Sequence, residues 1–191
     1  MFSDLITSKS RVKLLNVFLA NPSEMYHVRE IVRRTEDEIN AVRRELLFLE
    51  EKGVLHREAR GNRVYYSLSK NYPFYFDLLR LGAKTVGLGK EILKNRAKIG
   101  KMKYAMFSGR FARRLTKEPN SVDFLIVGMV VLPELAILIR DEEKRLDTEI
   151  NYTVMTEEEF LFRKKKRDPF ILSILNGSRI TLVGDEESML A

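Results

Sequence analysis

The amino-acid sequence predicts a mixed α/β (α+β) fold, with an N-terminal helical module, a helical connector and a C-terminal unit built on a mixed sheet. Three observations predict it. Apolar residues recur at helical spacing up to about Lys52, two strand-like runs follow Gly53, and strands alternate with helices in the second half. Such alternation is typical of layered α/β structures. The 191 residues have room for two small domains, and we place the segments at 1–70, 71–100 and 101–191.

Two helices are expected at the start of the chain. Ser10–Ala20 carries apolar residues at the spacing of a wide buried face, and Asn21–Ser23 ends this helix. Val28–Arg33 has the pattern of a short second helix.

A longer third helix should follow a tight turn. Thr35 is expected to cap it, with Glu38 completing a capping box. The helix runs to about Lys52, and Gly53 is a natural residue to end it. Its buried stripe consists of Ile39, Val42, Leu46 and Leu49. A short helix, a tight turn and a long helix make a helix-turn-helix outline.

A β-hairpin is expected after the third helix. The runs Val54–Glu58 and Val64–Leu68 have strand character, and Gly61 and Asn62 between them suit a turn with a basic tip. With this hairpin, residues 8–70 resemble a winged helix-turn-helix transcription regulator of the bacterial and archaeal repressor kind. The most family-like stretch is 46–55, with its Leu-X-X-Leu-Glu-X-X-Gly pattern. The resemblance implies double-stranded DNA as the partner and a homodimer that binds two half-sites.

The DNA-binding candidates are polar residues opposite the buried stripe and at the hairpin tip. Asparagine can bond adenine bidentately and arginine can bond guanine, while arginines near the tip and the second helix suit phosphates. The candidates are Arg29, Arg34, Asn40, Arg43, Arg44, Arg60, Asn62 and Arg63. The alternative is that the arginines only pair with Glu36, Glu38 and Glu45. The acidic run 36–38 would also repel nearby phosphates.

Strands and helices alternate beyond the connector. The connector Pro73–Arg96 should be helical, with a weak point near Gly82, Gly87 and Gly89. The expected strands are Lys103–Phe107, Ser121–Val127, Glu149–Thr156 and Ile180–Val183. Leu132–Leu146 is expected to form a helix, and Glu157–Leu175 one or two helices.

A turn with Gly109 and Arg110, followed by Ser121 and Asp123, resembles the site of the minimal, polymerase-beta-like nucleotidyltransferases, a likeness that extends over residues 71–185. That family has serine at the position of Arg110 and a first aspartate at the position of Ser121. Two-metal chemistry needs paired carboxylates, so these departures imply a vestigial, inactive site made of Gly109, Arg110, Ser121, Asp123 and Glu149, with no catalytic residue. Arg110, Arg113 and Arg114 are instead candidates to bind an anion. A structural role for Asp123, capping a loop or pairing with an arginine, is the alternative.

The amino-acid composition restricts the partners, metal sites and cellular location that the chain can have. The net charge is +7, its excess lies in residues 1–100, and it suits a polyanionic partner. No cysteine and two histidines exclude disulfides, thiolate metal sites and histidine-rich metal clusters, and no metal or cofactor is expected. The run 164–167 is basic, and a solvated helix face is its simplest interpretation. No signal peptide, membrane span or membrane partner is expected, so a cytoplasmic location is the default.

Together these patterns predict a DNA-binding transcription regulator whose degenerate nucleotidyltransferase-like domain serves dimerisation or ligand sensing, with a nucleotide or another anion as the effector. Two alternatives stay open at this point. One is a nucleotidyltransferase acting on a protein or small-molecule acceptor, and the other is an antitoxin-like interaction protein.

Overall fold

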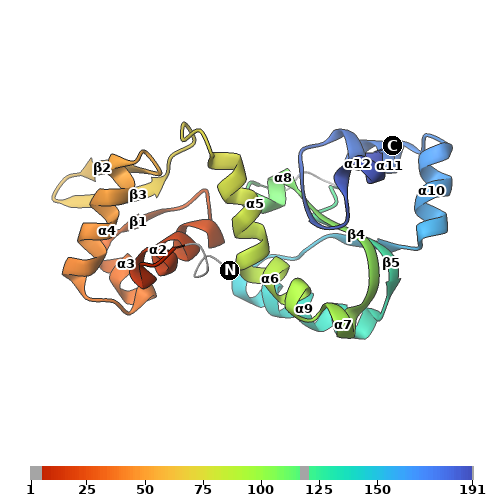
Figure 1. Ribbon diagram of the computed structural model, residues 1–191, viewed down its shortest axis with the longest axis horizontal. Helices are drawn as coiled ribbons and strands as arrows, with labels where there is room; N and C mark the ends of the chain where they lie inside the picture. The colour runs from red at the N-terminus through yellow and green to blue at the C-terminus, as the bar shows by residue number, and fades with distance from the viewer. Residues whose placement is uncertain (1–5, 117–120, 191) are drawn as a thin grey trace. The chain divides into compact units, whose positions relative to one another are not determined.

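The computed structural model describes residues 6–116 and 121–190. It divides into two compact units, with the boundary between Val86 and Gly87 (Figure 1). The connector therefore contributes to both units, because its first helix packs with the first unit and its later helices with the second. The units differ from the three segments expected from sequence, and whether those segments are functional domains stays a prediction.

The first unit contains four helices and three strands among the described residues. Its elements are α2 (Lys9–Ala20), β1 (Met25–His27), α3 (Val28–Thr35), α4 (Ile39–Glu51), β2 (Leu55–Arg60), β3 (Arg63–Leu68) and α5 (Tyr75–Thr85). The strands form an antiparallel sheet in the order β1-β3-β2. The three-residue β1 was not expected from sequence, because only its pairing with β3 makes it a strand.

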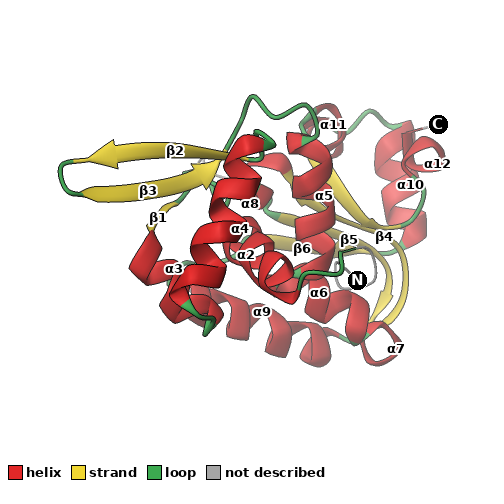
Figure 2. Cartoon of the chain, turned by 60° about the vertical axis from the view of Figure 1, so that its left-hand side comes forward, coloured by secondary structure: helices red, strands yellow, loops and turns green. Residues whose placement is uncertain are grey.

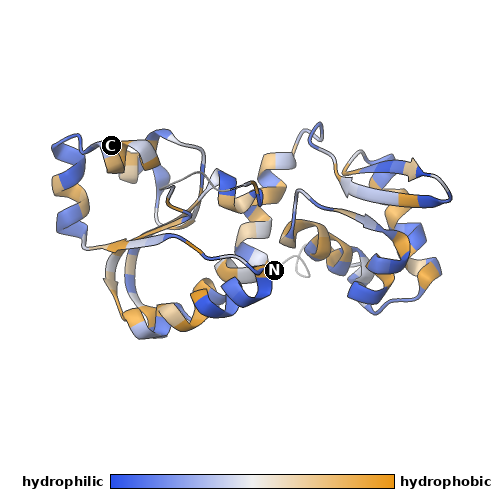
Figure 3. Cartoon of the chain, turned by 180° about the vertical axis from the view of Figure 1, so that it is seen from behind, coloured by the Kyte–Doolittle hydropathy of each residue, from blue (hydrophilic) through white to orange (hydrophobic). Residues whose placement is uncertain are grey.

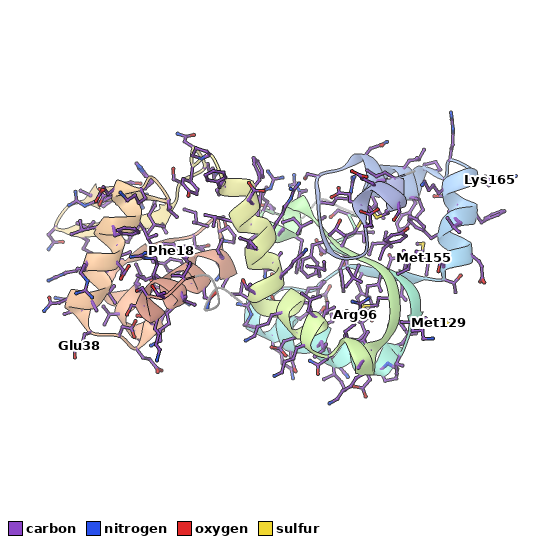
Figure 4. All side chains as sticks on the ribbon, viewed as in Figure 1. Phe18, Glu38, Arg96, Met129, Met155 and Lys165 are labelled. Atoms are coloured by element: carbon purple, nitrogen blue, oxygen red, sulfur yellow. The ribbon has the colours of Figure 1, made fainter. Side chains whose placement is uncertain are left out.

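Apolar side chains from all the helices meet in the core of the first unit. Phe18, Ile31 and Leu46 are completely buried, and Phe18 meets Tyr26 edge-on with ring centroids 5.5 Å apart. Figure 4 shows Phe18 inside this unit. Helix α5 packs on α2 so closely that a Cβ at Gly82 would lie 2.9 Å from the Cβ of Leu19. Glycine at this position therefore fixes α5 to the first unit.

The turn between α3 and α4 differs from the expected capping box. Thr35 is the last residue of α3, and its hydroxyl donates to the carbonyl of Ile31 at 2.9 Å. Glu36 ends α3 in the left-handed conformation with φ 55°, and Glu38 precedes α4 without a side-chain cap. The prediction that Thr35 caps the third helix is therefore wrong, because α3 is two residues longer than expected and includes Thr35. Gly53, with φ 73°, does follow the end of α4 as predicted.

The hairpin is longer than its sequence pattern suggested. Strands β2 and β3 continue to the tip, where Arg60 pairs with Arg63 across the two residues Gly61 and Asn62. Gly61 has φ 57°, a conformation that glycine adopts without a steric penalty. Figure 2 shows the hairpin as a two-stranded arm that reaches past α3 and α4, and Figure 3 shows hydrophilic residues at its tip.

The second unit is built on a four-stranded mixed sheet in the order β6-β5-β4-β7. Only β5 and β6 are parallel, and α9 connects them. Its elements are α6 (Gly87–Lys94), α7 (Arg96–Ile99), β4 (Gly100–Ser108), α8 (Gly109–Ala112), β5 (Phe124–Val130), α9 (Leu132–Leu146), β6 (Tyr152–Met155), α10 (Glu157–Lys165), α11 (Pro169–Asn176), β7 (Arg179–Val183) and α12 (Glu186–Leu190). The predicted mixed α+β fold with its mixed sheet is confirmed, as are the break near Gly87 and the helix Leu132–Leu146.

Helices cover both faces of this sheet (Figure 1). Tyr104, Met106 and Leu125 face a core shared with Phe160 of α10 and Ile171 of α11. The alternate strand residues face α9 with α6 and α7, which lie on the other side of the strands in Figures 1 and 2. The sheet is therefore a buried layer, which explains its strongly apolar strand sequences.

Candidate functional site

Helix α4 presents a polar face to solvent, as its sequence period predicts. Val42 and Leu46 are fully buried. The opposite face carries Asn40, Arg43 and Arg44, all of them exposed. The predicted exposed polar face is therefore confirmed, and the predicted buried stripe is confirmed for Val42, Leu46 and Leu49, whereas Ile39 is only half-buried and lines a concave surface.

A concave surface of about 480 Å³ lies between the start of α3, helix α4 and the hairpin. It brings together five of the polar side chains of the first unit: Arg29, Arg43, Arg57, Asn62 and Arg63. Within the described part of the chain, none of these four arginines forms an ion pair. The concavity therefore concentrates positive charge that no described carboxylate neutralises.

Arg57 was missed at the sequence level. It lies in the middle of β2 and pairs with Tyr66 of β3, well behind the tip. Arg60 and Arg63 flank the predicted turn and were therefore recognised from the sequence. The position of Arg57 beside α4 depends instead on the register of the hairpin strands. A two-residue turn at Gly61–Asn62 fixes that register, because it pairs Arg60 with Arg63 and therefore Arg57 with Tyr66.

The remaining predicted DNA-binding residues lie outside the concavity. Asn40 and Arg44 are on the exposed face of α4. Arg34 pairs with Glu30 at 2.8 Å, and Arg60 pairs with Glu58 at 2.7 Å. Arg34 and Arg60 are thus already neutralised by carboxylates, whereas the four arginines of the concavity are not.

The acidic residues near α4 have partners of their own. Buried Glu45 accepts from Ser8 and from Nε of Arg11, both at 2.8 Å. Asp37 pairs with Lys13 at 2.6 Å, and the hydrogen bond from Lys13 lowers the pKa of the Asp37 carboxyl. The alternative that Glu45 neutralises the candidate arginines is therefore wrong. Glu38 lies at the outer surface, as Figure 4 shows, without an ion pair to those arginines.

His27 fixes the start of α3 beside this concavity. Its Nδ1 accepts a hydrogen bond of 3.3 Å from the backbone N–H of Arg29, and its ring lies 5.6 Å from that of Tyr65. A histidine at the helix N-cap thus holds the backbone that carries Arg29.

In the second unit, the pair Ser121 and Asp123 does not lie on a strand. Strand β5 begins at Phe124, and Asp123 is buried in the preceding loop, where its carboxylate accepts from the N–H of Asn151 at 3.0 Å. Glu149 is exposed and precedes β6, which begins only at Tyr152. The expected strands Ser121–Val127 and Glu149–Thr156 are therefore wrong at their starts. The hydrogen bond matches the loop-capping interpretation of Asp123.

A second cavity, of about 350 Å³, contains part of the expected vestigial site. Arg110, Ser121 and Arg179 line it, together with apolar residues of β4 and α11. Nη2 of Arg110 donates to the carbonyl of Thr116 at 2.7 Å. Of the three arginines expected to bind an anion, Arg110 is the one that lines this cavity.

The neighbouring Arg113 and Arg114 donate hydrogen bonds to other groups of the second unit. Nε of Arg113 donates to the carbonyl of Gly109 at 2.9 Å, and Nη2 of Arg114 donates to buried Glu142 at 2.9 Å. Gly109 itself approaches β7 so closely that a Cβ there would lie 2.1 Å from Oγ of Ser178. Close packing against Ser178 thus explains why glycine occupies position 109.

Across residues 6–116 and 121–190, no three histidine, aspartate or glutamate side chains converge to share a metal ion. In the same residues, no helix has both the length and the apolar character to cross a membrane.

No protein-family model and no curated protein matches the sequence. Among solved structures, the chain is similar to reduced HlyU from Vibrio cholerae N16961, with 23% sequence identity and a TM-score of 0.33. The similarity covers 42% of this chain and 83% of that one.

Proposed function

We propose that the chain is a sequence-specific, double-stranded DNA-binding transcription regulator of the winged helix-turn-helix kind. One observation carries the proposal: Arg29, Arg43, Arg57 and Arg63 line one concavity beside the exposed face of α4, and none has a described ion-pair partner. The major groove of B-DNA admits an α-helix, and phosphates line both sides of it. A helix flanked by unneutralised arginines is complementary to that groove.

The residues divide between two roles. Asn40, Arg43 and Arg44 on the exposed face of α4 read base edges, because asparagine and arginine form bidentate bonds with adenine and guanine. The arginines of α3 and the hairpin contact phosphates and set the register of α4 in the groove. They are Arg29, Arg34, Arg57, Arg60 and Arg63, with Asn62 at the tip.

The regulator acts as a homodimer. One α4 helix contacts few base pairs, and specific affinity of a helix-turn-helix protein comes from two half-sites about one helical turn apart. The second unit, with its nucleotidyltransferase-like pattern, serves dimerisation or senses an anion. The supporting observation is the cavity that Arg110, Ser121 and Ser178 line, since a cavity with a guanidinium and hydroxyl donors suits a phosphate-bearing effector such as a nucleotide.

DNA binding is tested with the full chain and a duplex selected by it from a random-sequence library. Fluorescence anisotropy should give an affinity that falls steeply with salt. The double variant Arg43→Ala/Arg44→Ala should bind at least about thirtyfold more weakly, because each bidentate base contact contributes about 1–3 kcal/mol. Both side chains are exposed, so thermal unfolding should be unchanged.

Arg96→Ala is the matched control, because Arg96 is an exposed arginine on α7 of the second unit (Figure 4). It should bind the selected duplex like the unaltered chain. Selection that enriches no sequence, or an Arg43→Ala/Arg44→Ala variant that binds as tightly as the Arg96→Ala variant, would show that α4 does not read DNA.

A further inference from the structure

Leu47 is an exposed apolar side chain on an otherwise polar helix face. It is 57% exposed, and among the described residues up to Lys70 it is the one large apolar side chain that is exposed. It lies one helical turn after Arg43, and both line the concavity between α4 and the hairpin. Leucine at this position contributes nothing to the core, so its apolar surface is available to a partner.

The surroundings of Leu47 restrict what that partner is. Arg43, Arg57 and Arg63 line the same concavity. An apolar protein surface docked on Leu47 would desolvate these charges without pairing them, which is unfavourable. A ligand made only of phosphate would pair the arginines and leave the leucine in water. The partner that satisfies both carries an apolar group between two lines of negative charge.

A thymine in duplex DNA has this combination. Its C5-methyl group projects into the major groove, where apolar side chains contact it, and the phosphates of both strands flank it. RNA does not offer this combination to a helix, because uracil lacks the methyl group and the major groove of A-form RNA is too deep and narrow for side chains to read.

We propose that Leu47 recognises a thymine methyl group and so specifies a thymine in the DNA site. Arg43, one turn earlier on the same face, contacts a neighbouring base. The inference rests on the proposed DNA binding and adds to it one residue that selects a base by apolar contact. Leu47 was not among the residues singled out for DNA binding from the sequence, where only polar side chains were considered.

The test replaces each thymine of the selected duplex, one at a time, by deoxyuridine, which removes only the methyl group. Binding of the full chain is measured by fluorescence anisotropy. At one thymine of each half-site the replacement should weaken binding about fourfold, the effect expected for losing one buried methyl group. In the Leu47→Ala variant, thymine and uracil at that position should bind equally well, whereas Leu47→Met should keep the preference.

Leu81→Ala is the matched control, since Leu81 is also exposed, at 41%, and lies on α5 outside the concavity. It should keep the fourfold preference for thymine. A preference that persists unchanged in Leu47→Ala, or a duplex in which no thymine is preferred over uracil, would overturn the role of Leu47 while leaving DNA binding intact. Selection that enriches no duplex, or tighter binding to RNA of the same sequence, would overturn both.

Discussion

Nη2 of Arg114 donates a hydrogen bond of 2.9 Å to Glu142, whose side chain is only 5% exposed. Arg145 donates to both oxygens of the same carboxylate, at 2.6 and 2.8 Å. Burial alone would raise the pKa of Glu142, but the hydrogen bonds from Arg145 and the charges of both arginines outweigh it and lower that pKa. Burial lowers the pKa of Arg114, and Glu142 offsets part of that effect. The ion pair between Arg114 and Glu142 connects the turn after α8 to α9.

Glu142→Gln should destabilise the second unit by up to about 3–5 kcal/mol, because it removes the charged carboxylate to which buried Arg114 donates at 2.9 Å. Urea unfolding monitored by circular dichroism measures this loss. Asp141→Asn is the control, since Asp141 is the exposed neighbour on α9, and it should change the free energy of unfolding by no more than about 0.5 kcal/mol. Equal midpoints for the two variants would show that the buried pair adds nothing to stability.

The lowered pKa of Glu142 predicts that the free energy of unfolding depends on pH. The pKa of Glu142 is lower in the folded chain than its ordinary value of 4.5, so the folded state favours the ionised form. Its contribution to stability is complete above that value and is lost as the pH falls through the lower, folded pKa. Unfolding free energies measured from pH 6 downward should therefore decline less steeply in Glu142→Gln than in the unaltered chain. Parallel curves would contradict the lowered pKa.

Local patterns predicted most of the first unit. The exposed positions of Asn40, Arg43 and Arg44 follow from the helical period of α4, which is a property of the sequence alone. The end of α3 could not be predicted in this way. Threonine is a residue type that is favoured at helix N-caps, but the hydroxyl of Thr35 donates within α3 to the carbonyl of Ile31. The helix ends only at Glu36, which adopts the left-handed conformation.

The second unit shows where sequence reasoning fails. Asp123 was expected on a strand because apolar residues follow it, yet the strand begins after it and its carboxylate is used by the N–H of Asn151, 28 residues away. Arg114 was grouped with Arg110 as an anion ligand because the two are close in sequence. Its partner Glu142 lies 28 residues away on α9, and such long-range pairing leaves no local pattern.

Gly109→Ala should destabilise the turn after β4. Its new Cβ would lie 2.1 Å from Oγ and 2.8 Å from Cβ of Ser178, so the chain must shift, at a cost of about 1–3 kcal/mol. Thermal unfolding measures the loss. Because the obstacle is the side chain of Ser178, the double variant Gly109→Ala/Ser178→Gly should be more stable than the sum of the two single changes predicts. Strict additivity would show that the close approach to Ser178 is not what requires glycine.

Arg60 and Arg63 face each other across the hairpin tip, yet they should contribute unequally to DNA binding. Arg60 is held by Glu58 at 2.7 Å, whereas Arg63 has no ion-pair partner among the described residues and lines the concavity beside α4. Arg63→Ala should weaken binding to the selected duplex and reduce the slope of log affinity against log salt by about one. Arg60→Ala should change both less, because it removes a charge that Glu58 already neutralises.

Glu58→Gln provides the reciprocal experiment at the same tip. It releases Arg60 from its 2.7 Å ion pair, so the tip gains one positive charge that can reach a phosphate. Binding should become tighter and its salt slope steeper, each by about the effect of one phosphate contact. The gain should vanish in Glu58→Gln/Arg60→Ala, since the released cation is then absent. An unaltered salt slope in Glu58→Gln, together with equal losses in Arg60→Ala and Arg63→Ala, would mean that the hairpin tip does not approach the DNA backbone.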